Sequence, residues 1–322
     1  MADSCTNPGS YSRLEHIDIL KAVGIICVLI GHLYAPLPIK VFIYSFHMPL
    51  FFLISGFFLK TDRSLGFILS KSLRHLMIPY LITYLAMTLI DVIFNGISAD
   101  RMINRLMMFV YGISSNIVPG EHFDITQIGP IWFLLALFWA QMIVVMTWHV
   151  KVNTGTLSRL LRGMIIILLS LIAIITGYRI WMPLAFLNGV VASIFVWIGS
   201  EAKEQDLRKV LYKRSTIVIA SVIWMICLIA DYLRGMHFSI SIFQFPLYGL
   251  GFIGAVCGAI VLLNLSRGLT MINLKPVMPF LSNIGRSTLE IMCVHAVDIE
   301  TVRWPNGGVL RRKHVSLRCG YW

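Results

Sequence analysis

The chain has 322 residues, of which 57% are hydrophobic and only 13% are charged, whereas soluble domains average roughly 45–50% and about 25%. The mean hydropathy is +0.80, and apolar runs recur along most of the sequence. One soluble core cannot bury that much apolar surface. The composition excludes an ordinary soluble enzyme and predicts an all-α polytopic membrane protein.

The net charge of +12 would suggest a nucleic-acid partner in a soluble protein. Here Lys and Arg cluster in short loops between apolar segments, where they set orientation in a membrane, so we expect a lipid bilayer and no nucleic acid. The six cysteines include no CxxC pair. We interpret them as small core residues, neither disulfides nor metal ligands. The polar start of the chain shows no cleavable signal peptide.

A helix needs about twenty residues to cross a bilayer, and nine apolar segments have that length, in one bundle. They lie at 17–36, 39–59, 75–95, 129–149, 163–180, 182–200, 215–233, 241–265 and 277–298. A tenth candidate, 102–112, is short and has Arg101 and Arg105 at its start. We expect it to be re-entrant or interfacial within an outward-facing segment, 97–128.

The distribution of basic residues predicts the topology. With nine spans and a cytoplasmic N-terminus, the inner loops hold fourteen Lys and Arg and the outer loops five, as the positive-inside rule requires. We therefore expect a cytoplasmic N-terminal segment, 1–16, and one transmembrane domain, 17–298. The segment 299–322 is polar and basic without apolar periodicity, so it is predicted to be an atypical or disordered tail.

The first predicted span contains three ionisable residues, Asp18, Lys21 and His32. At 100° per residue they share one helix face, and His32 lies about 16 Å along the axis from Lys21. Ionisable side chains inside a membrane are costly and are by default functional or paired in the bundle interior. The alternative is an intrahelical Asp18–Lys21 ion pair near the interface, with His32 as a polar residue near the helix end.

The second predicted span contains His47 within an apolar run. The tight turn Pro36-Leu37-Pro38 makes the first two spans antiparallel, so His32 and His47 should lie at similar depth. Two histidines without Cys or carboxylate neighbours are a weak metal signal, and no metal is expected. A general base is the better interpretation, because histidine titrates near neutral pH.

Further candidates follow along the chain. Lys71 and Arg74 are one turn apart and suit phosphate binding, although anchoring the topology is the more common use of such cations. Trp132 suits either a sugar platform or an interface anchor. Glu290 and His295 lie about 140° apart on the last span, so they form no simple pair, and either could meet the first two helices.

Several of these segments resemble acyltransferase family 3, and especially its fucose 4-O-acetylase-like branch. Lys21 and His32 fit that family's motif of a basic residue and a histidine separated by ten residues. The run Phe46-His47-Met48-Pro49-Leu50-Phe51-Phe52-Leu53-Ile54-Ser55-Gly56, the pair Lys71 and Arg74 with Pro79-Tyr80, the run Trp132-Phe133-Leu134 and the stretch from Gly285 to His295 are similar to further motifs. The resemblance covers roughly residues 13 to 296.

The resemblance implies a multi-pass protein of the bacterial inner membrane. It would transfer acetyl or another acyl group from cytoplasmic acyl-CoA, a co-substrate, to a hydroxyl of a surface polysaccharide, O-antigen or lipid-linked sugar. His32 would be the general base or a transient acyl acceptor, and His47 would orient groups or relay protons. Asp18 and Lys21 would fix the acyl-CoA end. No bound cofactor is expected.

The resemblance also implies roles for six further residues. Glu290 and His295 would join the catalytic group, Lys71 and Arg74 would bind the CoA phosphates, and Trp132 and Ser55 would bind the acceptor. Two features depart from the family pattern: Met292 stands where tyrosine is frequent, and the polar segment 299–322 replaces apolar sequence.

Two other functions remain as alternatives. A transporter or flippase for a glycan or small solute would also place His, Lys and Asp inside the membrane. No internal symmetry is visible, and the polar residues concentrate in the first two spans and the last. A lipid-carrier glycosyltransferase is disfavoured by the absence of a DxD pair.

Overall fold

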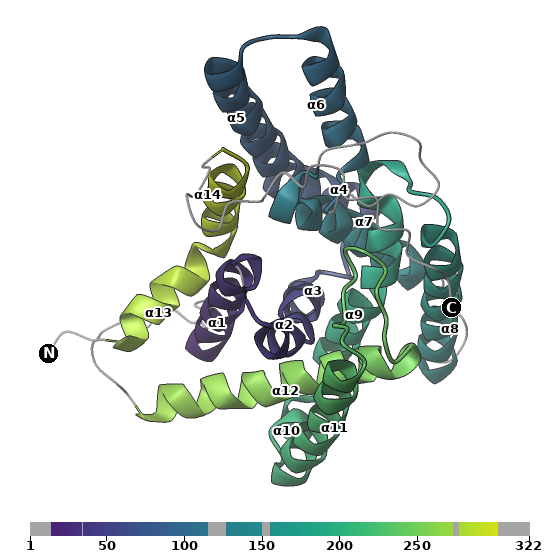
Figure 1. The fold of residues 1–322 in the computed structure, drawn as a ribbon. Helices are drawn as coiled ribbons and strands as arrows, with labels where there is room; N and C mark the ends of the chain where they lie inside the picture. Colours follow the sequence, from purple (N-terminus) through teal and green to yellow (C-terminus); the bar gives the residue numbers. More distant parts are fainter. Residues whose placement is uncertain (1–13, 34, 115–126, 150–154, 273–276, 302–322) are drawn as a thin grey trace, which may run out of the picture.

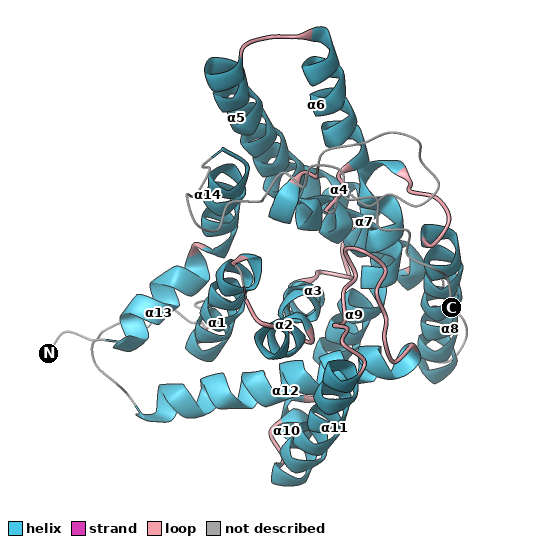
Figure 2. Ribbon diagram, in the orientation of Figure 1, coloured by secondary structure: helices cyan, strands magenta, loops and turns pink. Residues whose placement is uncertain are grey.

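The computed structural model describes residues 14–33, 35–114, 127–149, 155–272 and 277–301 (Figure 1). Within these ranges the secondary structure is helical, and Figure 2 shows helices joined by loops. The predictions for 1–13, for 115–126 and for most of the C-terminal tail, 302–322, lie outside the described residues. An isolated antiparallel bridge joins Ser239 to Gln244.

Fourteen α-helices occur in the described ranges. They are α1 (Glu15–His32), α2 (Leu37–Tyr44), α3 (His47–Phe58), α4 (Leu65–Ser72), α5 (Ile78–Asn95), α6 (Ala99–Tyr111), α7 (Trp132–Trp148), α8 (Gly155–Gly177), α9 (Phe186–Glu204), α10 (Arg208–Leu211), α11 (Arg214–Leu233), α12 (Gly249–Ile272), α13 (Val277–Arg286) and α14 (Thr288–Thr301). A π-helix, Leu73–Met77, joins α4 to α5, and the 3₁₀ turns Gly129–Ile131 and Pro183–Ala185 precede α7 and α9.

In the part of the chain that the structure describes, seven helical segments are long and apolar enough to cross a membrane. They are Leu37–Phe58, Leu65–Asn95, Gly129–Trp148, Gly155–Gly177, Pro183–Glu204, Arg214–Leu233 and Gly249–Ile272. The protein is an all-α polytopic membrane protein, which confirms the predicted fold class.

The first and last predicted spans are helical but more polar or more broken than the other seven. The helix α1 carries Glu15, Asp18 and Lys21 in its first half. The segment 277–298 is divided at Ser287 into α13 and α14. These two regions pack against each other, since α1 contacts both α13 and α14.

The short segment 102–112 forms α6, whose 13 residues extend about 20 Å, less than the hydrocarbon thickness of a bilayer. It runs beside α5 (Figure 1). The hydroxyls of Tyr80 and Tyr84 donate to the carbonyls of Phe109 and Arg105, at 2.7 and 3.2 Å. The helix is therefore held to α5 by side-chain bonds and is too short to be a span of its own.

The predicted span 241–265 begins later than expected, because α12 starts at Gly249 and residues 236–248 form a loop. Phe243 and Tyr248 have positive φ angles, 53° and 49°, and a helix cannot continue through such residues. The loop enters the bundle, where Asn188 donates from Nδ2 to the carbonyl of Ile240 at 2.8 Å. Irregular backbone at this depth is tolerated where it is buried in protein.

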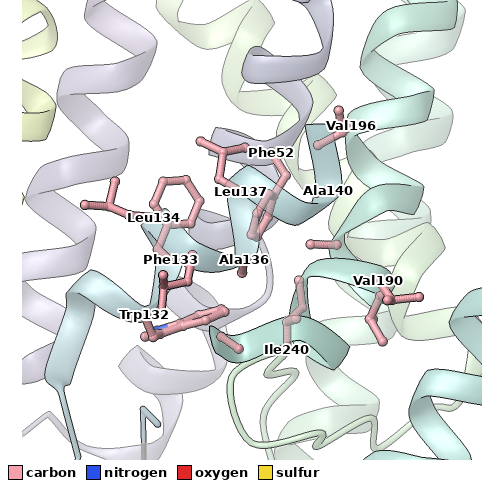
Figure 3. Packing of buried hydrophobic residues seen from close by; sticks show 14 of the residues in the cluster. Phe52, Trp132, Phe133, Leu134, Ala136, Leu137, Ala140, Val190, Val196 and Ile240 are labelled. Carbon is pink, nitrogen blue, oxygen red and sulfur yellow. The ribbon is translucent and has the colours of Figure 1, made fainter. Parts of the chain in front are cut away.

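The helices α3, α7 and α9 form the centre of the bundle (Figure 3). The rings of Phe52 and Phe133 lie 4.9 Å apart between α3 and α7. Glycines bring α3 and α9 together: a Cβ on Gly56 would lie 2.0 Å from the carbonyl oxygen of Val196, and one on Gly199 would lie 2.1 Å from that of Leu53. Small residues of this kind allow close helix packing in membranes and fix the position of α3.

Candidate functional site

A cavity of about 500 Å³ opens between α1, α3, the start of α7, the loop 236–248 and α14. Five of the predicted site residues line it: Lys21, His32, His47, Ser55 and Trp132. Asp18, Lys71, Arg74, Glu290 and His295 do not. The structure thus brings half of the predicted site residues together around one cavity, and the other five do not line it.

The two histidines predicted at similar depth face this same cavity. His32 is the last residue of α1, and His47 is the first residue of α3. The second span breaks before His47 because Pro49 has no N–H and its ring clashes with the carbonyl four residues earlier. Phe46, at the break, has the non-helical angles φ −135° and ψ −29°. The proline therefore places His47 at a helix start.

The His47 ring has a defined orientation. Its Nδ1 lies 2.9 Å from the carbonyl oxygen of Ile43, and a carbonyl accepts only, so Nδ1 donates. In the neutral imidazole, Nε2 then carries the free lone pair. The side chain is 4% exposed, so the surrounding protein fixes this tautomer. His47 can therefore accept a proton at Nε2.

Tyr44 and His237 extend this group, and both were missed by the sequence analysis. The Tyr44 ring lies edge-on between the rings of His47 and His237, at centroid distances of 4.8 and 4.6 Å. Its hydroxyl donates to the carbonyl of Gly31 at 3.3 Å. His237 lies in the loop that follows α11, far along the sequence, and no local motif marks it.

His237 lies outside the membrane-spanning segments, so its charge state depends on how that loop packs. Burial lowers the pKa of His237, and the nearby cation of Lys40 lowers this pKa further. The side chain is partly buried and lines the cavity. His237 therefore favours the neutral form at this end of the cavity.

His295 lies next to His32, although it does not line the cavity. The two ring centroids are 5.3 Å apart, with planes tilted by 45°. The His295 Nε2 is buried, and no hydrogen-bond partner for it occurs among the described residues. The last helix therefore does meet the first, through His295. Glu290, on the same helix, is exposed and contributes no contact to the cavity.

Asp18 and Lys21 form an ion pair of 2.8 Å within α1. Asp18 is buried, and its second carboxylate oxygen lies 3.5 Å from Nε of Arg286 on α13. The two helices touch at Gly285, where a Cβ would lie 1.7 Å from the carbonyl oxygen of Asp18. Arg286 was not among the predicted site residues. The ion pair of the alternative interpretation is therefore present, and Lys21 also lines the cavity.

Lys71 and Arg74 are exposed on α4 and the π-helix. The residues that reach the cavity from this segment are His75 and Leu76. A π-helix carries more residues per turn than an α-helix, which changes the face that each side chain occupies, and such segments are frequent at functional sites. Sequence spacing alone assumes a regular helix and therefore could not select His75.

Ser55 takes part in a chain of side-chain hydrogen bonds. Gln141 donates from Nε2 to the Ser55 hydroxyl at 2.8 Å, and Ser72 donates to Oε1 of Gln141 at 2.7 Å. These bonds join α3, α7 and α4. Trp132, at the start of α7, is only 5% exposed and forms part of the cavity wall.

The cavity is elongated along the helix axes. Lys21 precedes His32 by eleven residues on α1, which is about 16 Å, and Ser55 follows His47 by eight residues on α3, which is about 12 Å. Lys21 and Ser55 thus mark one end, and the histidines with Trp132 and the loop 236–248 mark the other. The arrangement offers a cation at one end and proton acceptors at the other, about half a bilayer apart.

Within the described ranges, no three His, Cys, Asp or Glu side chains are grouped so that they could hold a metal ion.

No curated protein and no solved structure matches the chain. A family model described as an acyltransferase domain matches residues 14–303. This range includes every described residue of the cavity and all of the described helices. The chain therefore belongs to the acyltransferase 3 family of membrane proteins.

Proposed function

We propose that this protein is an integral membrane O-acyltransferase. It moves an acetyl or other acyl group from cytoplasmic acyl-CoA to a hydroxyl of a surface polysaccharide, O-antigen or lipid-linked sugar, as in the fucose 4-O-acetylase-like branch that its motifs resemble. The observation that carries the proposal is the elongated cavity, with Lys21 at one end and His32 and His47 at the other. We place it in a bacterial inner membrane with a cytoplasmic N-terminus, the domain at 17–298, and 299–322 as a tail.

In the proposed reaction, the acceptor hydroxyl oxygen attacks the thioester carbonyl carbon of acyl-CoA. His32 takes the hydroxyl proton, the carbon–sulfur bond breaks, and the CoA thiolate takes up a proton as it leaves. His32 suits this step because it lies at the cavity surface and its partner ring, His295, keeps an unpartnered buried nitrogen beside it. In a relay, His32 itself accepts the acyl group before the sugar does.

The proton acceptor must be held in place, and His47 is better fixed than His32. Its Nδ1–H bond to Ile43 directs Nε2 as acceptor. We propose that His47 relays the proton that His32 removes, and that Tyr44, bonded to the end of α1 at Gly31, keeps α1 and α3 in register. Trp132, in the wall at the same end, suits the sugar ring.

At the other end, Lys21 supplies a positive charge for the donor, and Asp18 positions it. Lys71 and Arg74 are exposed next to His75, where the CoA phosphates could reach them as the acyl arm enters. The location of Ser55 favours a role along the acyl path over the predicted acceptor role. Glu290 takes no part in the proposed mechanism.

The test is to express the chain in bacteria and analyse the surface glycan by mass spectrometry and NMR for a base-labile acyl ester. We expect an ester with the wild type and none with His32→Ala, which makes the helix end more apolar and should still insert in the membrane. The matched control is His149→Ala, because the His149 Nδ1 also bonds a carbonyl four residues earlier, at 2.8 Å, outside the cavity. An ester that persists in His32→Ala would remove His32 from the mechanism. No ester from folded protein would favour the transporter alternative.

A further inference from the structure

A second cavity, of about 350 Å³, lies between α1, α3, α9, α10 and α12. Its walls are apolar, with Leu20, Leu53, Phe57, Ala259 and Leu263 among them. It contains none of the histidines of the first cavity, in which we place the proposed reaction and which we call the reaction cavity. Ile54 borders both spaces, so the second cavity lies beside the first on the other side of α3.

The rim of this second cavity is polar and cationic. His16, Arg208, Tyr212 and Arg267 line it, and no Asp or Glu does. The Tyr212 hydroxyl lies 3.2 Å from Nε2 of His16, and the Arg267 guanidinium lies over the Tyr212 ring at 4.1 Å. These contacts hold His16, Tyr212 and Arg267 together as one group.

The charges on the rim are only partly neutralised within the protein. Arg208 pairs with Asp206 on the exposed surface, whereas Arg267 has no carboxylate partner within the residues that the structure describes. Its guanidinium lies over the Tyr212 ring, and a guanidinium presents its N–H groups in a fork that suits a planar or tetrahedral oxyanion.

The position of the rim matches a membrane surface. It is formed near the beginning of α1 and the ends of α9 and α12, and α12 passes across α1 and α3 (Figure 1). These helix ends lie on the same side as Lys21 and Ser55. A cationic rim above an apolar slot at this level is complementary to a lipid with a phosphate headgroup.

We infer that this second cavity binds an anionic phospholipid of the bilayer. One acyl chain occupies the apolar slot between α3 and α12, and the phosphate is bound by Arg267 together with Arg208. The inference does not depend on acyl transfer, because no residue of the reaction cavity other than the shared wall Ile54 takes part.

The test is lipid retention by purified, delipidated protein, measured by native mass spectrometry with added phosphatidylglycerol or phosphatidylcholine. We expect phosphatidylglycerol to bind in preference, and Arg267→Gln to weaken it by about tenfold. The matched control is Lys209→Gln, because Lys209 is an exposed cation on the same short helix as Arg208 that does not line the cavity. It should bind as the wild type does.

A second variant tests the slot independently of the charge. Ala202 lines the cavity and is partly buried, so Ala202→Phe should fill the slot and reduce phosphatidylglycerol binding with every rim cation present. Equal binding of the two lipids, or equal loss in Arg267→Gln and Lys209→Gln, would overturn the inference. Displacement of the lipid by inorganic phosphate alone would show an anion site only, and tighter binding of palmitoyl-CoA at the same residues would show a donor site. Both results would also overturn it.

Discussion

Two groups of polar side chains lie inside this bundle and differ in how they are satisfied. Between α8 and α9, Arg162 donates from Nη2 to Oε1 of Glu201 at 2.9 Å, with both side chains about nine-tenths buried. Gln205 donates to the other carboxylate oxygen at 3.0 Å, and the guanidinium lies over the Trp148 ring at 4.0 Å. Around the reaction cavity, by contrast, the His32 ring lies against the ring of His295, and His47 bonds a backbone carbonyl and lies edge-on to the Tyr44 ring.

This difference distinguishes polar side chains that hold helices together in a membrane interior from those that can act on a substrate. Both carboxylate oxygens of Glu201 accept bonds and the Trp148 ring covers the guanidinium, although the buried Arg162 Nε has no hydrogen-bond partner among the described residues. A charged pair enclosed to this degree holds helices together and leaves little capacity for a substrate. Neutral imidazoles with one nitrogen bonded and the other open keep a proton acceptor available. The bonding partners of an intramembrane polar residue thus indicate whether its role is structural or chemical. Four predictions test this comparison.

The largest effect is expected at the buried ion pair of Arg162 and Glu201. Glu201→Ala leaves the Arg162 charge buried without its partner and should lower the free energy of unfolding by about 3 kcal/mol. The measurement is thermal unfolding in detergent. The double variant Arg162→Met, Glu201→Met should recover most of that loss, because neither charge remains. If the double variant is as unstable as the single one, the pair is not what holds α8 to α9.

The histidines that face the cavity should affect activity more than stability. His47→Ala removes the oriented proton acceptor and should lower kcat by about a hundredfold. The protein should stay folded in detergent with a lowered unfolding temperature, because a buried ring and its backbone bond are lost. His149→Ala, which loses the same kind of bond to its own helix, should retain full kcat. Equal losses in the two variants would mean that the bond to the helix matters and the cavity position does not.

A smaller effect is expected from the Tyr44 hydroxyl, which bonds the carbonyl of Gly31. Tyr44→Phe keeps the ring contacts and removes the bond to Gly31, a loss of about 1 kcal/mol, or about fivefold in kcat. The matched control is Tyr84→Phe, which loses a comparable bond to the Arg105 carbonyl outside the cavity. A kcat for Tyr44→Phe equal to that of wild type would limit Tyr44 to a packing role.

The smallest effect is on the pH dependence of stability. Burial and the charge of Lys40 lower the pKa of His237, so below about pH 6.5 the unfolded chain binds a proton that the folded chain does not, and stability falls as pH falls. His237→Asn should reduce the drop in unfolding temperature between pH 7.5 and pH 5.5. Lys40→Gln should reduce it less, since Lys40 is the second cause. An unchanged drop in His237→Asn would contradict this account.

The sequence predicted the membrane class because apolar run length is a local property, and seven of the nine predicted spans correspond to helical segments that are long and apolar enough to cross a membrane. It predicted the shared position of His32 and His47 because a short turn and helical periodicity set depth. It could not place His75, His237 or Arg286, because a π-helix, a loop inside the bundle and a contact between α1 and α13 depend on packing across long sequence separations.

The sequence by itself determined that this chain spans a membrane and which family its motifs resemble. Composition and periodicity carry this information because lipid requires long apolar helices wherever they occur. Only the tertiary structure decided which polar groups share a cavity and which are closed off, since glycine contacts such as Gly285 with Asp18 and Gly56 with Val196 set how closely helices approach. Those approaches fix which side chains can meet, and no local pattern encodes them.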